Sequence, residues 1–513
     1  MSGRADRGGV LVGAWGGVLA LVAVTTGVRG VDLPAATYRV DLFAQRGFTL
    51  WDSQWYGGHW LFDYSVLYAP IAWLGGVTAT EIISAAVASW AFHRLAAARF
   101  ATAGRVGALV FATGTLVPVA IGQGPYLMGE AIALLALLAA RGGRPVLALP
   151  LAVVCSLVAP LAGAFLALAA AAWLVGDWPQ RRFSAAALAA AALVPIGVVE
   201  ELFPGQGNFP FSTHNFLGMM IGAVAVGLVA AIVRDRALAA GAALYVVAIL
   251  FAYEVPSALG NNITRLGISV GVALAVCLAW TARRSRLLLL VAVVPIALAQ
   301  WVPASNALAG KEGDIGVSRA YYQPLLRFLA RSDHPLGRVE VVPTALHWEA
   351  VYVALRFPLA RGWERQLDTA NNPIFYDPGR LTSRSYRAWL LQNGVRFVAL
   401  SNARLDYSAY GEAYLVRRGV PGLRLVWRDA DWRVYEVRGS QGILQGPGRL
   451  LSADGDGVEL RAIRAGAILL RVHYSAAWHV AKGDATVSRS PGGWLSVNAR
   501  GPGPVTLRIS FPT

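Results

Sequence analysis

Residues 10–28 read VLVGAWGGVLALVAVTTGV, and similar long apolar blocks recur up to about residue 301. An α-helix rises about 1.5 Å per residue, so a block of this length crosses the roughly 30 Å hydrocarbon core of a bilayer. The preceding residues, MSGRADRGG, are basic and polar, and no small-residue cleavage motif ends the block. A signal peptide usually has a shorter apolar core, so we predict an uncleaved first transmembrane helix with a cytoplasmic N-terminus.

The composition of the 513-residue chain also indicates a membrane protein. Hydrophobic residues make up 56% of the chain and charged residues only 14%, whereas a typical soluble domain has about 25% charged residues. Heavy use of Arg, Ala and Gly favours a bacterial source, and hence the bacterial cytoplasmic membrane. Cys155 and Cys277 fall inside apolar blocks, so the sequence suggests neither a disulfide framework nor a zinc site.

The formal net charge of +16 comes from basic residues that lie, in the first 300 positions, mostly in short gaps between apolar blocks. These gaps contain Arg4 and Arg7, Arg94 to Arg105, Arg141 and Arg144, Arg181 and Arg182, Arg234 and Arg236, and Arg283, Arg284 and Arg286. Short basic loops mark the cytoplasmic side of a membrane protein. The placement of the basic residues therefore indicates how the helices are oriented in a membrane, and it argues against a nucleic-acid partner.

If the basic gaps are cytoplasmic, the sequence predicts about eleven transmembrane helices. They are expected at about 9–30, 66–92, 105–121, 126–140, two short helices within 145–176 that turn at Pro160, 184–200, 215–233, 237–253, 264–281 and 286–302. This odd number of crossings places the C-terminal region outside the cytoplasm. Seven acids then fall on the outer side: Asp32, Asp41, Asp52, Asp63, Glu200, Glu201 and Glu254.

We predict a transmembrane domain over residues 1–302, followed by two extracytoplasmic parts. Residues 303–440 mix helical spacing, as in YYQPLLRFLARS (321–332), with runs typical of strands, which predicts an α/β domain. Residues 441–513 are rich in Gly and contain short alternating segments such as GVELRAI (457–463). That pattern predicts a small module resembling a β-sandwich.

Asp32 directly follows the first predicted helix and is the first candidate catalytic residue. A carboxylate at a helix end on the membrane surface can act as a general base toward a hydroxyl group. The alternative is that Asp32 only keeps the loop in water, and residue spacing alone favours that alternative.

The stretch LWDSQWYGGHWLFDYSVLYAP, residues 50–70, places aromatic rings and acids together after that helix. Its candidate substrate-binding residues, grouped around Asp52, are Trp51, Trp55, Tyr56 and His59. Aromatic rings can cover the apolar faces of a sugar while acids accept hydrogen bonds from its hydroxyls. An aromatic belt at the membrane interface would also explain the rings, but such a belt needs neither the Gly57-Gly58 pair nor an acid.

A third group of candidates lies in EVPSALGNNITRLGIS, residues 254–269, and consists of Glu254, Asn262 and Arg265. An Arg at the mouth of a helix bundle suits a phosphate, and the alternative is an interfacial Arg whose stem lies along apolar surface. His214 lies in another polar loop predicted on the same side. Residues 347–368 are dense in Arg, Trp and acids, and we expect a solvated or domain-packing face there, with a lid over the membrane site as the alternative.

Three of these features resemble the GT-C superfamily of membrane glycosyltransferases. They are Asp32 after the first helix, the Trp55–His59 turn before the second helix, and the Asn262–Arg265 motif before a late helix. The predicted hairpin of short helices, SLVAPLAGAFLALAA (156–170), and the C-terminal outer region fit the same layout. The resemblance implies a GT-C-like helical domain with an extracytoplasmic domain after it.

The resemblance also implies inverting transfer of a sugar from a polyprenyl-phosphate donor in the bilayer to an extracytoplasmic glycan or lipid acceptor. Asp32 would take the proton of the acceptor hydroxyl. Asp52 and Asp41 are alternative candidates for the general base, or they could help to bind a divalent cation. Arg265 or another outer Arg would meet the donor phosphate.

Two other functions stay open. Relatives in the superfamily often carry a His a few positions after the first Asp, and this chain has Ala35-Ala36-Thr37 there. That departure leaves a non-catalytic scaffold or assembly protein of the cell envelope as the first alternative. A membrane transporter is the second, although we find no obvious repeated halves and no charged residue near the middle of a predicted helix.

Overall fold

The computed structural model describes residues 7–28, 30–61, 65–176, 182–203, 207–282, 286–309, 314–332 and 336–510. The chain divides into two compact units, each discontinuous in sequence. The first comprises Met1–Ala36 and Phe62–Glu312, and the second comprises Thr37–Leu61 and Gly313–Thr513. Residues 1–302 were predicted to form one domain, whereas Thr37–Leu61 group with the C-terminal region. Asp63 lies outside the described residues.

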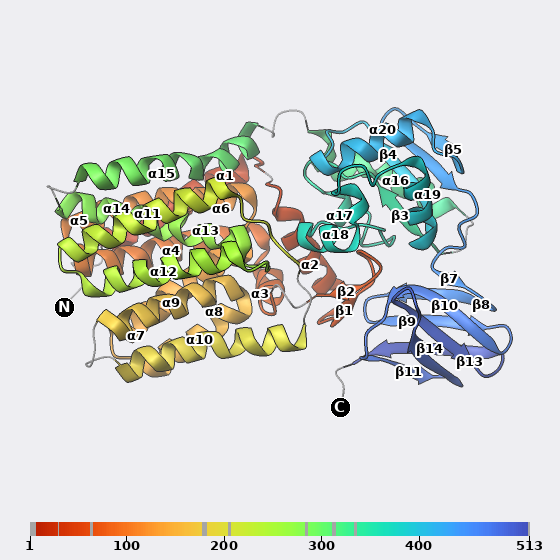
Figure 1. The fold of residues 1–513 in the computed structure, drawn as a ribbon, viewed down its shortest axis with the longest axis horizontal. Helices are drawn as coiled ribbons and strands as arrows, with labels where there is room; N and C mark the ends of the chain where they lie inside the picture. Colours follow the sequence, from red (N-terminus) through yellow and green to blue (C-terminus); the bar gives the residue numbers. More distant parts are fainter. Residues whose placement is uncertain are drawn as a thin grey trace. The chain divides into compact units, whose positions relative to one another are not determined.

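The first unit is a set of α-helices (Figure 1). Its longer helices are α1 (Arg7–Thr25), α3 (Tyr68–Gly75), α4 (Val77–Phe100), α5 (Thr102–Gly114), α6 (Leu116–Ile121), α7 (Gly124–Arg141), α8 (Pro145–Val158), α9 (Pro160–Gly176), α10 (Arg182–Leu202), α11 (Thr213–Ile232), α12 (Arg236–Glu254), α14 (Val272–Thr281) and α15 (Arg286–Ala309). Within the described residues, eight helices are long and apolar enough to cross a membrane, or nine if the bent pair α3–α4 is one span. These helices fit a polytopic helical membrane protein.

Glycine and proline interrupt these helices. The helices α3 and α4 are bent by 104° at Gly76, whose φ of 86° favours glycine. The helix α8 ends at Val158 because Ala159 precedes Pro160 and takes an extended conformation, with φ −151° and ψ 100°. The predicted pair of short helices with a turn at Pro160 is therefore confirmed.

Small residues bring the helices of this unit close together. A Cβ atom placed on Gly16 of α1 would lie 2.3 Å from Ser89 Oγ and 3.0 Å from the carbonyl oxygen of Ala85, both in α4. A Cβ atom on Gly107 of α5 would lie 2.2 Å from Cys277 Sγ of α14. Lipid tails are as apolar as Leu, so helices in a membrane associate through close van der Waals packing of this kind.

The second unit contains a four-stranded mixed sheet with the strand order β3-β4-β6-β5. Its strands are β3 (Arg338–Val341), β4 (Val395–Ser401), β5 (Leu423–Arg428) and β6 (Trp432–Val437), and its helices are α16 (Arg319–Arg331), α17 (Glu349–Tyr352), α18 (Arg365–Asn371), α19 (Ser383–Gln392) and α20 (Tyr410–Arg418). The strands β3 and β4 are parallel, and the other pairs are antiparallel. Tyr386 of α19 and Ala413 of α20 share a buried core with Val398 of β4.

The same unit contains two further four-stranded sheets, ordered β12-β13-β10-β7 and β11-β14-β9-β8 (Figure 1). The strands are β7 (Leu444–Gln445), β8 (Gly448–Asp454), β9 (Gly457–Ala462), β10 (Gly466–His473), β11 (Trp478–Lys482), β12 (Ala485–Arg489), β13 (Trp494–Ala499) and β14 (Gly503–Ile509). Leu460 and Leu507 of one sheet and Leu470 and Leu495 of the other are buried in one core. The two sheets therefore form a sandwich in which alternate residues of each strand face the shared core.

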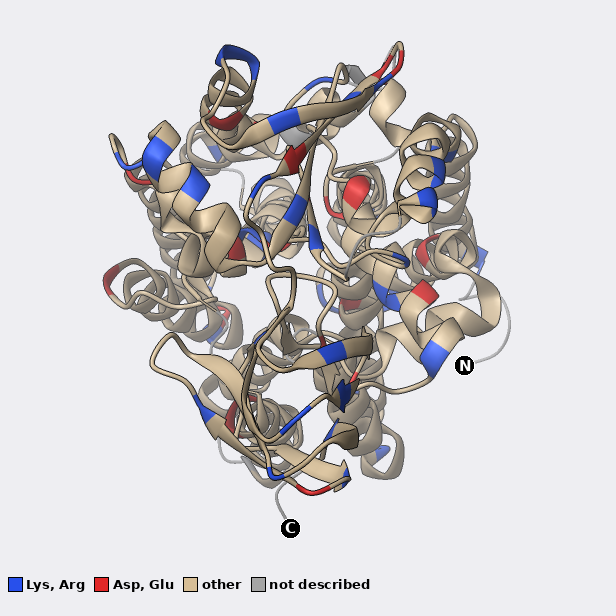
Figure 2. Cartoon of the chain, turned by 90° about the vertical axis from the view of Figure 1, so that its right-hand side faces the viewer, with Lys and Arg blue, Asp and Glu red and all other residues tan. Residues whose placement is uncertain are grey.

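Figure 2 shows basic and acidic positions interspersed on the side of the chain that faces the viewer.

Candidate functional site

Asp32 lies between α1 and α2 (Leu33–Arg46), where the chain packs against the turn between α6 and α7. Its backbone N–H donates to the carbonyl oxygen of Ile121 (2.9 Å), and Gln123 Nε2 donates to its Oδ2 atom (2.9 Å). A Cβ atom on Gly30 would lie 2.2 Å from the Ile121 backbone, so this close approach requires glycine. Backbone and side-chain contacts together fix the position of the Asp32 carboxyl group.

Arg265 interacts with Asp32 from a distant part of the sequence. It lies in α13 (Thr264–Leu266), and its Cζ atom is 5.2 Å from the centroid of the Tyr126 ring in α7. Burial raises the pKa of Asp32 above its usual value of 3.8, while the Arg265 charge and the Gln123 hydrogen bond lower it. The net direction is upward, which makes the carboxylate more basic than a solvated Asp. Two residues predicted separately thus belong to one site.

Asn262 supports the backbone that carries Arg265. Its Nδ2 atom donates to the carbonyl oxygen of Ala258 (2.9 Å), across the 3₁₀ turn η1 (Gly260–Ile263). The hydroxyl of Tyr245 donates to the carbonyl oxygen of Ile263 (2.8 Å) and accepts from the N–H of Gly267 (3.1 Å). Gly267 begins a π-helical turn, η2 (Gly267–Gly271). Single π turns inside α-helices are frequent at functional sites.

Several residues of this site were not predicted from the sequence. They are Gln123, Tyr126, Glu130 and Ser269. Ser269 Oγ lies 2.7 Å from Glu130 Oε1 and 2.9 Å from the carbonyl oxygen of Arg265. Glu130 is only 5% exposed although it lies inside the apolar helix α7. An acid within an apolar span is a functional signal, and this signal could have found Glu130.

A second acid, Glu81, is 3% exposed inside α4. A Cβ atom placed on Gly124, at the start of α7, would lie 3.4 Å from Glu81 Cγ and 2.4 Å from the Tyr68 hydroxyl oxygen. The seven acids predicted on the outer side did not include Glu81 or Glu130. The prediction that no charged residue lies near the middle of a helix overlooked Glu81 and Glu130, which are buried within α4 and α7.

His214 and Glu254 are exposed at the ends of α11 and α12. The loops that carry them lie side by side, because Asn215 Nδ2 donates to Asn261 Oδ1 (2.8 Å) and Thr213 Oγ1 lies 3.0 Å from the Tyr253 hydroxyl oxygen. The two polar loops predicted on one side are thus adjacent. Among the described residues, neither His214 nor Glu254 forms a hydrogen bond or an ion pair with Asp32 or Arg265, so the substrate-binding roles of both residues stay predictions.

Residues 50–61 of the aromatic stretch belong to the second unit, where the candidate residues are buried. Asp52 is 0% exposed, and its Oδ2 atom accepts a hydrogen bond from the Tyr38 hydroxyl (2.6 Å). Trp55 is stacked between Tyr38 and His59, with ring centroids 4.2 and 5.6 Å away, and its Nε1 atom donates to the carbonyl oxygen of Ala350 (3.1 Å). Burial and the neighbouring Asp52 raise the pKa of Tyr38 well above its usual value, so the hydroxyl stays protonated and donates.

Trp51 and Tyr56 also pack inside the second unit. Trp51 belongs to the core of the sandwich, with its ring centroid 6.3 Å from that of Trp478. Tyr56 is 1% exposed, and its hydroxyl donates to the carbonyl oxygen of Glu364 (2.9 Å). An interfacial belt would expose these rings. Their burial is instead explained by the packing of the stretch against residues far along the chain.

The Gly57-Gly58 pair lies in a tight turn between two short strands. The strands β1 (Trp51–Asp52) and β2 (His59–Trp60) are antiparallel, with Asp52 opposite His59. The φ angles of Gly57 and Gly58 are 80° and 119°, which favour glycine. A Cβ atom on Gly58 would also lie 2.5 Å from the Trp51 ring.

Residues 347–368, predicted as a solvated or packing face, contribute to two buried groups of charges. Arg361 lies 3.4 to 3.6 Å from Glu412, Asp368 and Glu340, with its guanidinium 4.0 Å from the centroid of Phe375. These distances join Arg361 Nε or Nη1 to carboxylate oxygens. Three carboxylates around one cation are costly to bury, and burial raises the pKa of Glu340 and Glu412. These buried contacts of Arg361 with three carboxylates are typical of an ion-pair network with a structural role.

In the second group, His347 lies between two acids, with Nδ1 3.3 Å from Glu349 Oε1 and Nε2 3.4 Å from Asp406 Oδ2. Burial alone would lower the pKa of His347, but its contacts with the carboxylates of Asp406 and Glu349 raise that pKa to about 9. Arg365 donates to Asp406 Oδ2 (2.8 Å). His347 is therefore held in its charged form at neutral pH.

Asp41, the third predicted acid, lies in α2 and is half-buried. Burial raises its pKa, and the nearby charge of Arg319 lowers it. Among the described residues, no group of three or more His, Cys, Asp or Glu side chains has a geometry that could hold a metal ion. The divalent cation stays a prediction.

Neither a protein-family model nor a curated protein sequence matches the chain.

Proposed function

We propose that this protein transfers a sugar from a polyprenyl-phosphate donor to an extracytoplasmic glycan or lipid acceptor. The observation that carries the proposal is the surroundings of Asp32 in the apolar helical unit: Asp32 accepts a hydrogen bond from Gln123, and the charge of Arg265 acts on its carboxyl group. A basic carboxylate and a cation suited to phosphate are the two groups that such a transfer requires. The resemblance of the Asp32, Trp55–His59 and Asn262–Arg265 segments to the GT-C superfamily supports the same function.

The proposal includes eleven membrane crossings. They are the eight long apolar helices, the bent pair α3–α4 taken as one span, and the two short helices α8 and α9. With the N-terminus in the cytoplasm, the basic gaps are then cytoplasmic and the second unit is extracytoplasmic. On this topology Asp32 and Arg265 belong to the outer half of the helical unit, which an extracytoplasmic acceptor can reach.

In the proposed reaction, the oxygen of an acceptor hydroxyl attacks the anomeric carbon of the donor sugar. Asp32 accepts the hydroxyl proton as the new bond forms. The bond between the anomeric carbon and the phosphate oxygen breaks on the opposite face, which inverts the configuration. Arg265, held against Tyr126, neutralises charge on the departing polyprenyl phosphate.

Of the three candidate acids, Asp32 has surroundings that support the role of base. One of its oxygens is oriented by Gln123, and its carboxyl group senses the charge of Arg265. Burial raises the pKa of Asp41 as well, but Asp41 belongs to the second unit, whereas Arg265 belongs to the helical unit. Asp52 is fully buried and already accepts a hydrogen bond from Tyr38. We therefore assign the proton transfer to Asp32 and a structural role to Asp52.

A transporter is the second candidate function, and Glu130 is the observation that favours it. A buried carboxylate inside an apolar helix, paired with Ser269, is a feature of ion and proton pathways. The interruptions at Ala159 and at residues 260–271 also match the broken helices of transporters. Coupled solute flux in proteoliposomes would support this candidate.

The experiment is the profile of lipid-linked glycans in a deletion strain of the source organism. We expect an intermediate to accumulate in the deletion strain and to disappear on complementation with the natural chain. Asp32→Asn keeps an oxygen for the Gln123 hydrogen bond but lacks the base, so this variant should not restore the profile. The exposed Glu201→Gln is the matched control and should restore it. Full restoration by Asp32→Asn at equal protein level would show that Asp32 is not the base and would contradict the proposed mechanism.

A further inference from the structure

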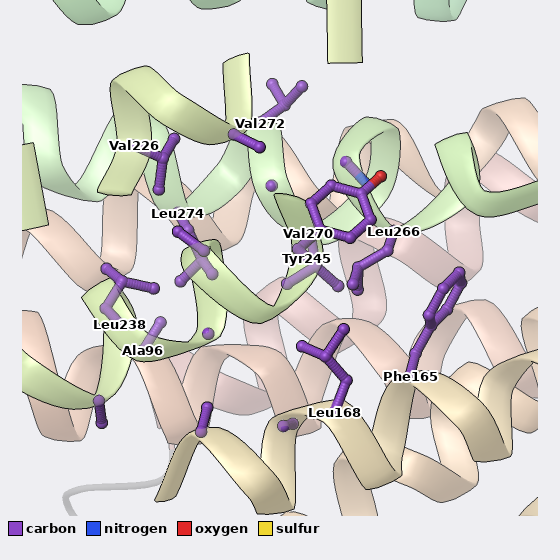
Figure 3. A pocket seen from close by; sticks show the side chains of 18 of the residues that line it. Ala96, Phe165, Leu168, Val226, Leu238, Tyr245, Leu266, Val270, Val272 and Leu274 are labelled. Carbon is purple, nitrogen blue, oxygen red and sulfur yellow. The ribbon is translucent and has the colours of Figure 1, made fainter. Parts of the chain in front are cut away.

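The helical unit contains a partly open apolar cavity of about 270 Å³ that the proposed transfer does not use. Figure 3 shows Phe165, Leu168, Tyr245, Leu266 and Leu274 around it. Its walls come from α4, α7, α9, α11, α12, α13, η2, α14 and α15, and most of its lining is aliphatic or aromatic. An engineered apolar cavity of about 150 Å³ already takes up small apolar molecules in another protein. The space is therefore large enough for part of a lipid chain.

The lining residues define the length and direction of the cavity. On α4 they run from Phe92 to Phe100, on α9 from Phe165 to Trp173, and on α12 from Ala237 to Tyr245. Each interval is eight residues, or about 12 Å at about 1.5 Å per residue. Cβ atoms placed on Gly176 and Gly241 would contact Ala237 and Ala172, so α9 and α12 run antiparallel. The cavity is thus an elongated slot along the helix axes.

One end of the slot is cationic. Arg99, in the last turn of α4, and Arg141, the last residue of α7, both line it. Arg99 forms an ion pair with Asp235, so its charge is compensated. Arg141 Nη2 donates to the carbonyl oxygen of Ala98 (3.2 Å), and no carboxylate pairs with Arg141 among the residues that the structure describes. The uncompensated positive charge at this end therefore belongs to Arg141.

The other end of the slot approaches the Asp32 and Arg265 site. Leu266 directly follows Arg265, and the Phe165 ring packs edge-on against Tyr126 with 6.4 Å between centroids. Arg141 and Arg265 therefore belong to opposite ends of the cavity. A phosphate at Arg141 would be a different ligand from the donor phosphate that we assign to Arg265.

We propose that this slot binds one acyl chain of an anionic bilayer phospholipid, with its headgroup phosphate at Arg141. The apolar walls suit the chain, and the guanidinium suits the phosphate. On the proposed topology, the Arg141 end faces the cytoplasmic leaflet, whose anionic lipids are attracted to basic residues. The site does not depend on sugar transfer and would exist in a scaffold or a transporter as well.

The test uses the full chain purified in detergent, with phosphatidylglycerol and phosphatidylcholine of identical acyl chains as probes. Native mass spectrometry measures the fraction of protein that retains each lipid. We expect preferential retention of phosphatidylglycerol and about tenfold weaker binding in Arg141→Gln, because one charge-assisted hydrogen-bonding partner is lost. Arg105→Gln, an exposed Arg near the start of α5 that does not line the slot, should bind as the natural chain does.

A second variant tests the apolar part of the site. Ala169→Phe places a ring in the slot and should reduce retention of phosphatidylglycerol while Arg141 is still present. Equal retention of the two lipids by the natural chain would overturn the proposal, as would equal binding by Arg141→Gln and Arg105→Gln. Displacement of phosphatidylglycerol by an equimolar polyprenyl phosphate would assign the slot to the donor lipid and would also overturn it.

Discussion

The second unit should lose stability as the pH rises from neutral to alkaline values, because His347 loses its proton. Its folded pKa is about 9 against an ordinary value of 6.5, so the charged form is favoured by folding. A raised pKa contributes stability that is fully present below about pH 6.5 and lost as the pH passes about 9. The difference between a pKa of 6.5 and one of about 9 corresponds to about 3 kcal/mol. Solvent screening is weak here because the His347 side chain is only 5% exposed.

The assay is pulse proteolysis of the full chain across a urea titration at several pH values, following the fragment that contains residues 336–510. Glu340 and Glu412, whose pKa values burial raises, titrate as well. The informative quantity is therefore the difference between the natural chain and His347→Gln. That difference should shrink by about 3 kcal/mol between pH 6.5 and pH 9. The exposed His479→Gln is the control and should follow the natural chain. Parallel pH curves for the natural chain and His347→Gln would refute the reasoning.

Two further predictions concern glycines at close contacts. Gly16→Leu should destabilise the helical unit by about 1–3 kcal/mol, because its Cβ atom would lie 2.3 Å from Ser89 Oγ. Thermal unfolding in detergent measures this, and Gly197→Leu, which has open space around it, should change the midpoint little. Gly58→Ala should destabilise the second unit by about 1–3 kcal/mol, since φ is 119° and the Trp51 ring is 2.5 Å away. Gly439→Ala has positive φ (84°) but no close neighbour, so a loss in Gly439→Ala as large as that in Gly58→Ala would contradict the steric part of the argument.

The helices of the first unit could be predicted because two strong signals agree along the sequence. Apolar blocks predict where the helices lie, and the basic gaps separate one block from the next. Their ends were less accurate. The second predicted helix stops at residue 92, whereas α4 continues to Phe100. Residues 93–100, HRLAAARF, contain good helix formers, so basic residues there do not end the helix.

The surroundings of the aromatic stretch could not be predicted, because its neighbours come from distant sequence. Trp55 bonds to Ala350, and Trp51 packs beside Trp478. Rings and acids alternating over a short stretch are compatible with a belt, a sugar site or a buried hairpin. The contacts with distant residues decide among these three structures. The pattern of residues 50–70 alone cannot identify those distant residues.

The candidate site was predicted in part. Asp32 and Arg265 could be predicted because they are charged residues at the ends of predicted apolar helices. Gln123 lies in a short turn, GQGP, that gives no chemical signal of its own. Glu130 was overlooked because the apolar residues around it dominate the hydropathy of α7.

The most direct test of the central claim is the release of free polyprenyl phosphate in proteoliposomes that contain the purified chain. The donor is the polyprenyl-phosphate sugar fraction of the source strain, and the acceptor is its membrane glycan fraction. We predict time-dependent release by the natural chain and a rate about 10²–10⁴-fold lower for Asp32→Asn, the range expected for loss of a general base. Equal rates of release from the two proteins would contradict the account.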